Sequence, residues 1–371
     1  MATYRYLLGD LLTNTINLEL SLFGVTYGRR LNKAGNATFS ITLGNKGTAG
    51  TPGDVGYSNS DILNATQPGR SVLWIERDGA LVWGGIVWSR TYDSQASVLT
   101  YTAQSFESYL YFQILEIKKS YVGQDQRAIL VDLINYMQTK PYANIGIITP
   151  TTYGPSAAIV RTVDFFSYIG WTVGRAIEYL TQYNLGFDYT IDVAYDNAGV
   201  PQKYLNVDNK LGASQIITSL AFDYPGNVKA YFYPESASNA ATSMLGFGGG
   251  TGASMTRTKY IIQSLLDAGY PDLQQSYDNT NVFSLATLVN QTKAAGDLAA
   301  VPVIVPTIEI FPDQNPAFGS YGLGDYFRMH VEDLRFPGGQ DVLARIIGWD
   351  VTPPNSTTLE TVKLVLEGAG N

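Results

Sequence analysis

The sequence predicts a β-rich α+β fold, with antiparallel β-structure at both ends of the chain and helices in the interior. Apolar and polar residues alternate in short segments near both ends, which is the pattern of half-buried strands. The 371 residues include 37 Gly and 16 Pro, and 12% of the residues are aromatic. This composition favours strands joined by turns. At roughly 150 residues a domain, the length predicts two to three domains.

The first 106 residues are predicted to form one antiparallel β-barrel or sandwich. The dipeptide Asp78-Gly79 lies between two apolar runs and is a strong hairpin signal, because Gly readily takes the positive φ of the turn. Residues 44–68 are rich in Gly, Ser, Asn and Pro and are expected to form a loop. The predicted strands are residues 17–22, 37–43, 71–77, 80–90 and 98–104.

Residues 107–200 change to a helical period and are predicted to form an α/β insertion. Residues 124–137 and residues 172–183 each place apolar side chains on one helical face. Residues 187–195 alternate again and are expected to form a strand.

Residues 201–300 are predicted to form a mixed region. A strand is expected at 229–233, and strand or mixed structure at 255–266. Apolar residues at helical spacing predict a helix over 283–300, which Ser284 could cap.

Residues 301–371 return to alternation and resemble residues 68–104. In both stretches a Gly-rich entry precedes a strand with a polar or acidic end, a second strand carrying Gly and Trp, and a third alternating strand. Unrelated meanders also share alternation, so the matched order of these features is what favours an internal repeat. The predicted strands of the last region are 303–311, 326–333, 343–351 and 359–366.

The composition excludes several classes of site. The chain has no Cys and a single His, His330, so thiol catalysis, disulfides and zinc–thiolate sites are excluded. Any metal would need mainly oxygen ligands. The net charge of −8 and the pI of about 4.7 argue against a nucleic-acid-binding groove. The sequence has no apolar run of about 20 residues that would predict a membrane span, and its start, MATYRYLLGDLL, lacks the features of a signal peptide.

The charged fraction is low. Charged residues make up 15% of the chain, against about 25% in an average soluble protein. The aromatic and apolar content excludes intrinsic disorder. A folded chain of this composition is expected to have much of its surface covered by other subunits.

Candidate catalytic patterns are weak. The loop at 246–252 (GFGGGTG) lacks the Lys-Ser/Thr pair of a P-loop, so a turn or a subunit-contact loop is favoured. His330 is expected on a strand surface, and no GxSxG motif supplies a nucleophile. Asp188 and Asp192 would lie about 13 Å apart on one strand, which is too far for a glycosidase pair. We therefore predict no enzymatic activity, no catalytic residues, no cofactor and no metal site.

Six segments in a fixed order carry a resemblance to a known family. They are LFGVTYGRRLNKAGNATFSI, PGRSVLWIERDGALVWGGIVWSRTYDS, TAQSFESYL, FDYPGNVKAYFYPESASNAATSMLGFG, GLGDYFRM and RIIGWDV. Together they extend over nearly the whole chain. This arrangement resembles the tail hub proteins of bacteriophages, also called baseplate hub, minor tail or tail-associated proteins. It is most similar to those of long-tailed siphophages that infect actinobacteria.

The resemblance implies two tube-type antiparallel β-barrels per chain, at residues 1–106 and 301–371. An α/β domain would be inserted at 107–200, and a mixed connecting region at 201–300 would add a helix and strands of the second barrel. Three subunits would place six similar barrels in a ring, so that a three-fold hub matches a six-fold tail tube. This implies a homotrimeric structural protein at the distal tail tip of the virion, made in the host cytoplasm, that closes the tube and opens for genome ejection.

The implied partners follow from that position. The ring would stack on the distal tail protein ring and hold the C-terminus of the tape measure protein in its lumen before infection. Other minor tail or receptor-binding proteins would attach, and DNA would pass through the lumen in transit. The sequence stops just after the last predicted strand, so receptor binding is expected to fall to separate proteins.

An acidic or neutral lumen would let DNA slide without sticking, because it avoids attraction to phosphate. The candidate lumen-facing acidic residues are Glu76, Asp78, Glu332 and Asp333. Solvated outer strand faces are an equal alternative for each of them. Two other functions also stay open: a tail-associated cell-wall hydrolase that uses Asp or Glu carboxylates, and a carbohydrate-binding tail protein that contacts the host envelope through aromatic side chains.

Overall fold

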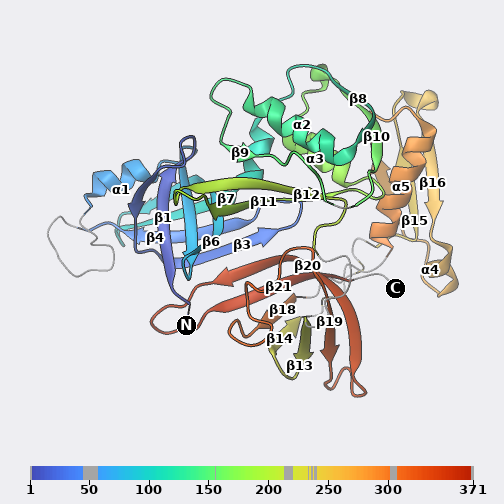
Figure 1. Cartoon of the computed structure of the whole chain (residues 1–371). Helices are drawn as coiled ribbons and strands as arrows, with labels where there is room; N and C mark the ends of the chain where they lie inside the picture. The colour runs from blue at the N-terminus through green and yellow to red at the C-terminus, as the bar shows by residue number, and fades with distance from the viewer. Residues whose placement is uncertain are drawn as a thin grey trace.

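The computed structural model describes residues 2–44, 57–154, 156–212, 220–232, 234, 237, 240–300 and 307–368. Four parts are visible in Figure 1. A first β region is blue to cyan, an α/β segment is mostly green, a small helix-covered sheet is orange, and a second β region, mostly red, lies at the bottom of the view. The structure confirms a β-rich fold with helices in the interior of the sequence.

The first β region consists of strands and one short helix. Its elements are β1 (Tyr4–Asp10), β2 (Ile16–Glu19), β3 (Phe23–Arg30), β4 (Asn36–Thr42), α1 (Asn59–Ala65), β5 (Ser71–Arg77), β6 (Ala80–Asp93) and β7 (Val98–Ser105). The sequence prediction does not include β3, because Gly24 and Gly28 have no side chains and interrupt the alternation of polar and apolar residues. Helix α1 lies inside the predicted loop at 44–68, where the Ser58 hydroxyl caps it. Residues 45–56 of that loop lie outside the described residues.

Strand β5 is buried on both faces. Leu73 and Ile75 belong to a core shared by both β regions, whereas Val72 and Trp74 belong to a second core built with the α/β segment. Alternation still sets these directions, because successive side chains of a strand point to opposite faces. The α/β segment is therefore packed directly on the first β region.

The α/β segment contains both helices that the sequence predicts. Its elements are η1 (Phe106–Phe112), β8 (Lys119–Asp125), α2 (Gln126–Gln138), β9 (Ile147–Ile148), β10 (Val160–Phe165), η2 (Ser167–Ile169), α3 (Val173–Thr181), β11 (Asp188–Tyr195) and β12 (Pro201–Asp208). Asp125 caps α2 and Thr172 caps α3, because each side chain accepts a backbone N–H of the first turn. The apolar faces of both helices enter the second core.

Residues 221–299 supply two strands to the second β region and a separate small sheet. The elements are β13 (Ala221–Tyr224), β14 (Val228–Phe232), β15 (Ser243–Phe247), η3 (Gly252–Ser254), β16 (Arg257–Ile261), α4 (Gln263–Asp267), β17 (Gln274–Asp278) and α5 (Leu285–Ala299). Helix α5 covers the sheet of order β16-β15-β17. Its Gly296 allows this close approach, since a Cβ there would lie 2.6 Å from the Tyr260 ring. Ser284 caps α5, as predicted.

The second β region is completed by the last strands. They are β18 (Thr307–Ile310), β19 (Tyr326–Val331), β20 (Gln340–Thr352) and β21 (Thr361–Gly368). Strand β14 pairs with β18, and β13 pairs with β19. Residues 303–306 of the predicted strand at 303–311 lie outside the described residues.

One sheet of 13 strands runs through both β regions, in the order β14-β18-β21-β20-β3-β4-β7-β6-β5-β1-β2, with β19 and β13 branching from β20. The two regions join where β20 pairs antiparallel with β3, from Gly348 opposite Arg30 to Val351 opposite Tyr27. We call this pairing the seam. The strand pairing shows two β regions joined in one sheet. That each region is a separate barrel stays a prediction.

The two regions contain the same three-strand meander. Strands β5, β6 and β7 pair in sequence order, and so do β19, β20 and β21. In each meander the middle strand carries an extra residue opposite the third strand. The extra residue is Trp88 in β6, and Ile347 in β20. Matching irregularities are stronger support for the internal repeat than alternation, because alternation is common to all such strands.

Candidate functional site

The four acidic candidates lie at corresponding ends of the two meanders. Glu76 and Asp78 lie at the β5–β6 hairpin, whereas Glu332 and Asp333 follow β19 in the β19–β20 connection. Among the described residues, no hydrogen bond or ion pair joins the first pair to the second. The structure therefore groups the candidates as two pairs at equivalent positions.

Glu76 is buried. The Arg5 guanidinium donates to its carboxylate at 3.2 Å, and the Tyr195 hydroxyl donates at 2.7 Å. Burial and this bond to Glu76 raise the pKa of Tyr195, which keeps the hydroxyl protonated as the donor. Because Tyr195 belongs to β11, the contact links the first β region to the α/β segment. In the single chain the charge of Glu76 is balanced by Arg5 and its carboxylate is hydrogen-bonded by Tyr195. Its lumen-facing position stays a prediction.

The other three candidates are more accessible. Asp78 is exposed in the hairpin turn, where it accepts the Thr3 backbone N–H at 2.8 Å. Glu332 is exposed just after β19. The Tyr231 hydroxyl donates to Asp333, and this bond, with backbone N–H groups of the following turn, lowers the pKa of Asp333. These three carboxylates fit an open acidic surface better than Glu76 does.

The residues considered for catalysis make structural contacts. His330 Nδ1 lies 2.7 Å from Asp341 Oδ1 across the β19–β20 pair. Asp188 is buried and accepts a hydrogen bond from Arg345, whereas Asp192 pairs with Arg29. Asp188 and Asp192 thus each form an ion pair with a different arginine.

Two ion pairs, each with at least one buried member, hold distant parts of the chain together. Arg345 of β20 reaches Asp188 of β11, and it also donates to the Leu211 carbonyl at 2.9 Å. Arg77 of β5 makes two hydrogen bonds of 2.9 Å with Glu360, which precedes β21. The sequence reasoning misses both pairs, because their members lie 157 and 283 residues apart. A charge inside the apolar run LARIIGW is a local hint that Arg345 is buried, but it does not identify the partner.

Lys203 is buried where β12 meets the first β region. Its ammonium donates to the carbonyl of Leu11 at 3.1 Å, and to the Ile145 carbonyl and Asn14 Oδ1 at 2.5 Å each. Desolvation lowers the pKa of Lys203 to about 7, against the opposing attraction of Asp10. The packing of the α/β segment on the first β region is therefore expected to respond to pH.

Two surface cavities stand out. One of about 540 Å³ lies between α1 and the strands β1, β2 and β5. Another of about 500 Å³ lies between the β11–β12 hairpin and the second β region beside Trp349. Within the described ranges, no cluster of three or more His, Asp and Glu side chains could hold a metal ion. The described helices include none long and apolar enough to cross a membrane.

Known proteins resemble this chain in fold rather than in sequence. No family model and no curated protein matches the sequence. The tail protein of Neisseria meningitidis MC58 matches 98% of this chain with 97% of its own, at a TM-score of 0.58 and 13% identity. The 43 kDa tail protein of prophage MuSo2 from Shewanella oneidensis matches over 98% of both chains, at a TM-score of 0.61 and 11% identity. Prophage tail protein gp18 of Listeria monocytogenes EGD-e matches 99% of this chain with 95% of its own, at a TM-score of 0.53 and 12% identity.

The chain has a tail-protein fold. The similarity extends over nearly the full length of each of these three proteins, so it includes both β regions and the segments between them. The tail-protein fold agrees with the resemblance seen in the sequence, and it confirms the β-rich architecture that the sequence predicts.

Proposed function

We propose that this chain is a structural protein of a phage virion that forms the homotrimeric hub ring at the distal end of the tail tube. The repeated meander carries this proposal, because its strand order and its bulge occur twice in one chain. A subunit with two similar β surfaces can match a six-fold tube with three copies. Three tail proteins that share the fold over nearly their whole length support the tail setting.

In this proposal each meander belongs to a tube-type β-barrel. Closure of the second barrel is supported by Asn227 at the β13–β14 turn, whose side-chain amide donates at 2.9 Å to the carbonyls of Ala221 and Asn315. The ring adapts the six-fold tube to the three-fold tip, stacks on the distal tail protein ring, and opens for DNA ejection. It holds the tape measure C-terminus, and other minor tail proteins attach to it. The phage is a long-tailed siphophage with an actinobacterial host.

The exposed apolar side chains support an assembled state. Val122, Tyr168 and Phe283 are 83%, 81% and 74% exposed in the single chain, and Leu298 is 73% exposed. Such exposed aromatic and apolar side chains are candidates for burial in contacts with other subunits. The low charged fraction of 15% points the same way.

Copy number in purified particles tests this proposal. Quantitative mass spectrometry should give three copies per tail, and immunogold labelling should place them at the distal tip. Six copies, or labelling along the tube, would instead indicate a distal tail or tube protein. Absence from the particles would contradict a structural role.

We also propose that the ring carries out no covalent chemistry. The arginine partners of Asp188 and Asp192 support this, because both carboxylates are engaged in ion pairs within the fold. A peptidoglycan zymogram of the purified chain should show no lysis band. A lysis band that disappears in an Asp192→Asn variant would favour the cell-wall hydrolase.

A further inference from the structure

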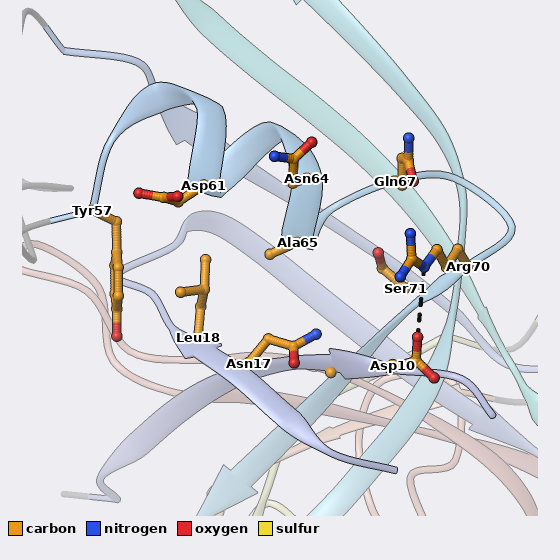
Figure 2. A pocket seen from close by; sticks show the side chains of 11 residues that line it. Asp10, Asn17, Leu18, Tyr57, Asp61, Asn64, Ala65, Gln67, Arg70 and Ser71 are labelled. Atoms are coloured by element: carbon orange, nitrogen blue, oxygen red, sulfur yellow. Dashed lines mark ion pairs between the residues drawn. The ribbon is translucent and has the colours of Figure 1, made fainter. Parts of the chain in front are cut away.

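The first of the two cavities lies on the first β region. It is bounded by helix α1 and by β1, β2 and the start of β5, and it holds about 540 Å³. Figure 2 shows its lining side chains, with Asp10, Asn17 and Leu18 on the strands and Asp61, Asn64 and Ala65 on α1. A cavity of this size is within the range of small-molecule sites.

One side of the cavity carries an oriented carboxylate with an arginine beside it. Asp10 accepts the backbone N–H groups of Leu12 and Thr13 at 3.0 Å each, and Arg70 lies 3.6 Å from its other oxygen. Burial favours a higher pKa for Asp10, but these hydrogen bonds lower it overall, so the carboxylate is charged at neutral pH. Its orientation is set before any ligand arrives.

Three amide side chains surround this ion pair. Asn17 of β2, Asn64 of α1 and Gln67 beyond α1 all line the cavity (Figure 2). In the described part of the chain, their amide groups have no hydrogen-bond partner. Each amide offers both donors and an acceptor, which is the combination that a sugar hydroxyl needs, since a hydroxyl both donates and accepts.

An aromatic ring closes the opposite end. Tyr57 stands beside Leu18 in Figure 2 and is 39% exposed. An exposed ring flanked by an aliphatic side chain forms an apolar wall on which the C–H face of a pyranose can pack. The charged groups of the lining are two carboxylates, Asp10 and Asp61, and one guanidinium, Arg70. This net negative charge disfavours phosphorylated or acidic ligands.

We propose that this cavity binds a neutral saccharide unit, with the ring packed on Tyr57 and its hydroxyls bonded by Asn17, Asn64 and the Asp10–Arg70 pair. This inference goes beyond the assembly role. It requires the fold of the single chain and does not depend on a trimeric ring.

Titration of the intact purified chain with neutral oligosaccharides tests the proposal. Chitotriose, maltotriose and lactose are the probes, with sialyllactose as an anionic comparison, followed by saturation-transfer NMR and calorimetry. At least one neutral probe should bind, and Tyr57→Ala and Asn64→Ala should each weaken that binding roughly tenfold or more. Both residues are exposed, so circular dichroism should show an unchanged fold.

The control variant is Tyr168→Ala, which removes an exposed tyrosine from the α/β segment and should leave saccharide affinity unchanged. The proposal is overturned if no neutral probe binds, if both cavity variants bind as well as the parent chain, or if sialyllactose binds more tightly than every neutral probe.

Discussion

The two β regions share a meander but differ in what covers it. In the first region β5 is buried from Ser71 to Glu76, because the α/β segment packs on its outer face. In the second region β19 alternates, with Phe327 and Met329 buried and Arg328 exposed. Strand order and the bulge are common to both, whereas the outer face follows what packs against it. The burial of a strand's outer face is therefore set by the segment that packs on it, whereas strand pairing is the same in both meanders.

The largest effect is expected where the second region is fastened to the α/β segment. Arg345→Ala would remove the buried arginine from Asp188, leaving Lys210 at 3.9 Å as its remaining cation, and would break the bond to the Leu211 carbonyl. Removal of one partner of a buried ion pair costs roughly 3–5 kcal/mol, and the extra bond places Arg345 at the upper end. Urea denaturation measures the loss. The double variant Arg345→Met with Asp188→Leu should recover part of it; a single variant as stable as the parent would mean that the two parts are not coupled here.

The next effect tests the covered face directly. Trp74→Ala should cost about 3 kcal/mol, the lower end of large-to-small core substitutions. The lower end applies because the buried Trp74 Nε1 has no hydrogen-bond partner among the described residues, so its loss also relieves an unsatisfied donor. Arg328→Ala on the outer face of β19 is the matched control and should change stability by less than about 0.5 kcal/mol. Thermal and urea unfolding measure both variants. Equal losses of stability in Trp74→Ala and Arg328→Ala would contradict the difference between the two faces.

A smaller, pH-dependent effect is expected at Lys203. Its pKa is about 7 in the folded chain and near 10.5 when solvated. Between these values the unfolded chain binds more protons, so stability should rise with pH, by at most about 1.4 kcal/mol per unit. Denaturation between about pH 7.5 and about pH 8.5 measures the slope where few tyrosines of the unfolded chain are ionised. Lys203→Met should remove that slope. If stability changes with pH equally in the variant and the parent chain, the slope comes from other groups.

The smallest effect is expected at the seam. Arg30 makes two hydrogen bonds of 2.8 Å with Asp350, but these side chains are 31% and 52% exposed. Arg30→Met should therefore cost about 0.2–1 kcal/mol, and less at high salt. Urea titrations at two salt concentrations measure both. A loss above about 2 kcal/mol would show that side chains, more than the backbone pairing, hold the two regions together.

The sequence predicts the meanders well and their contacts poorly. Residues 71–77 are predicted and observed as a strand with the same bounds, because an apolar run followed by Asp-Gly is a purely local signal. Helix α1 has no such signal, since its seven residues include just two that are buried. Glu76 shows the limit at the candidate site. Its position in the alternation is polar, but Arg5 and Tyr195 cover it from elsewhere in the chain, and periodicity carries no information on distant partners.

The seam also has a consequence for biosynthesis. Arg30 and Asp350 are 320 residues apart, and a ribosome adds roughly 5–20 residues per second. The outer edge of β3 therefore waits tens of seconds for β20 to emerge. An unpaired edge strand can pair with strands of other chains. Neighbouring nascent chains on one polysome could therefore aggregate through this edge. Expression at low temperature with abundant chaperones should favour soluble protein, and truncations that end before residue 340 should aggregate.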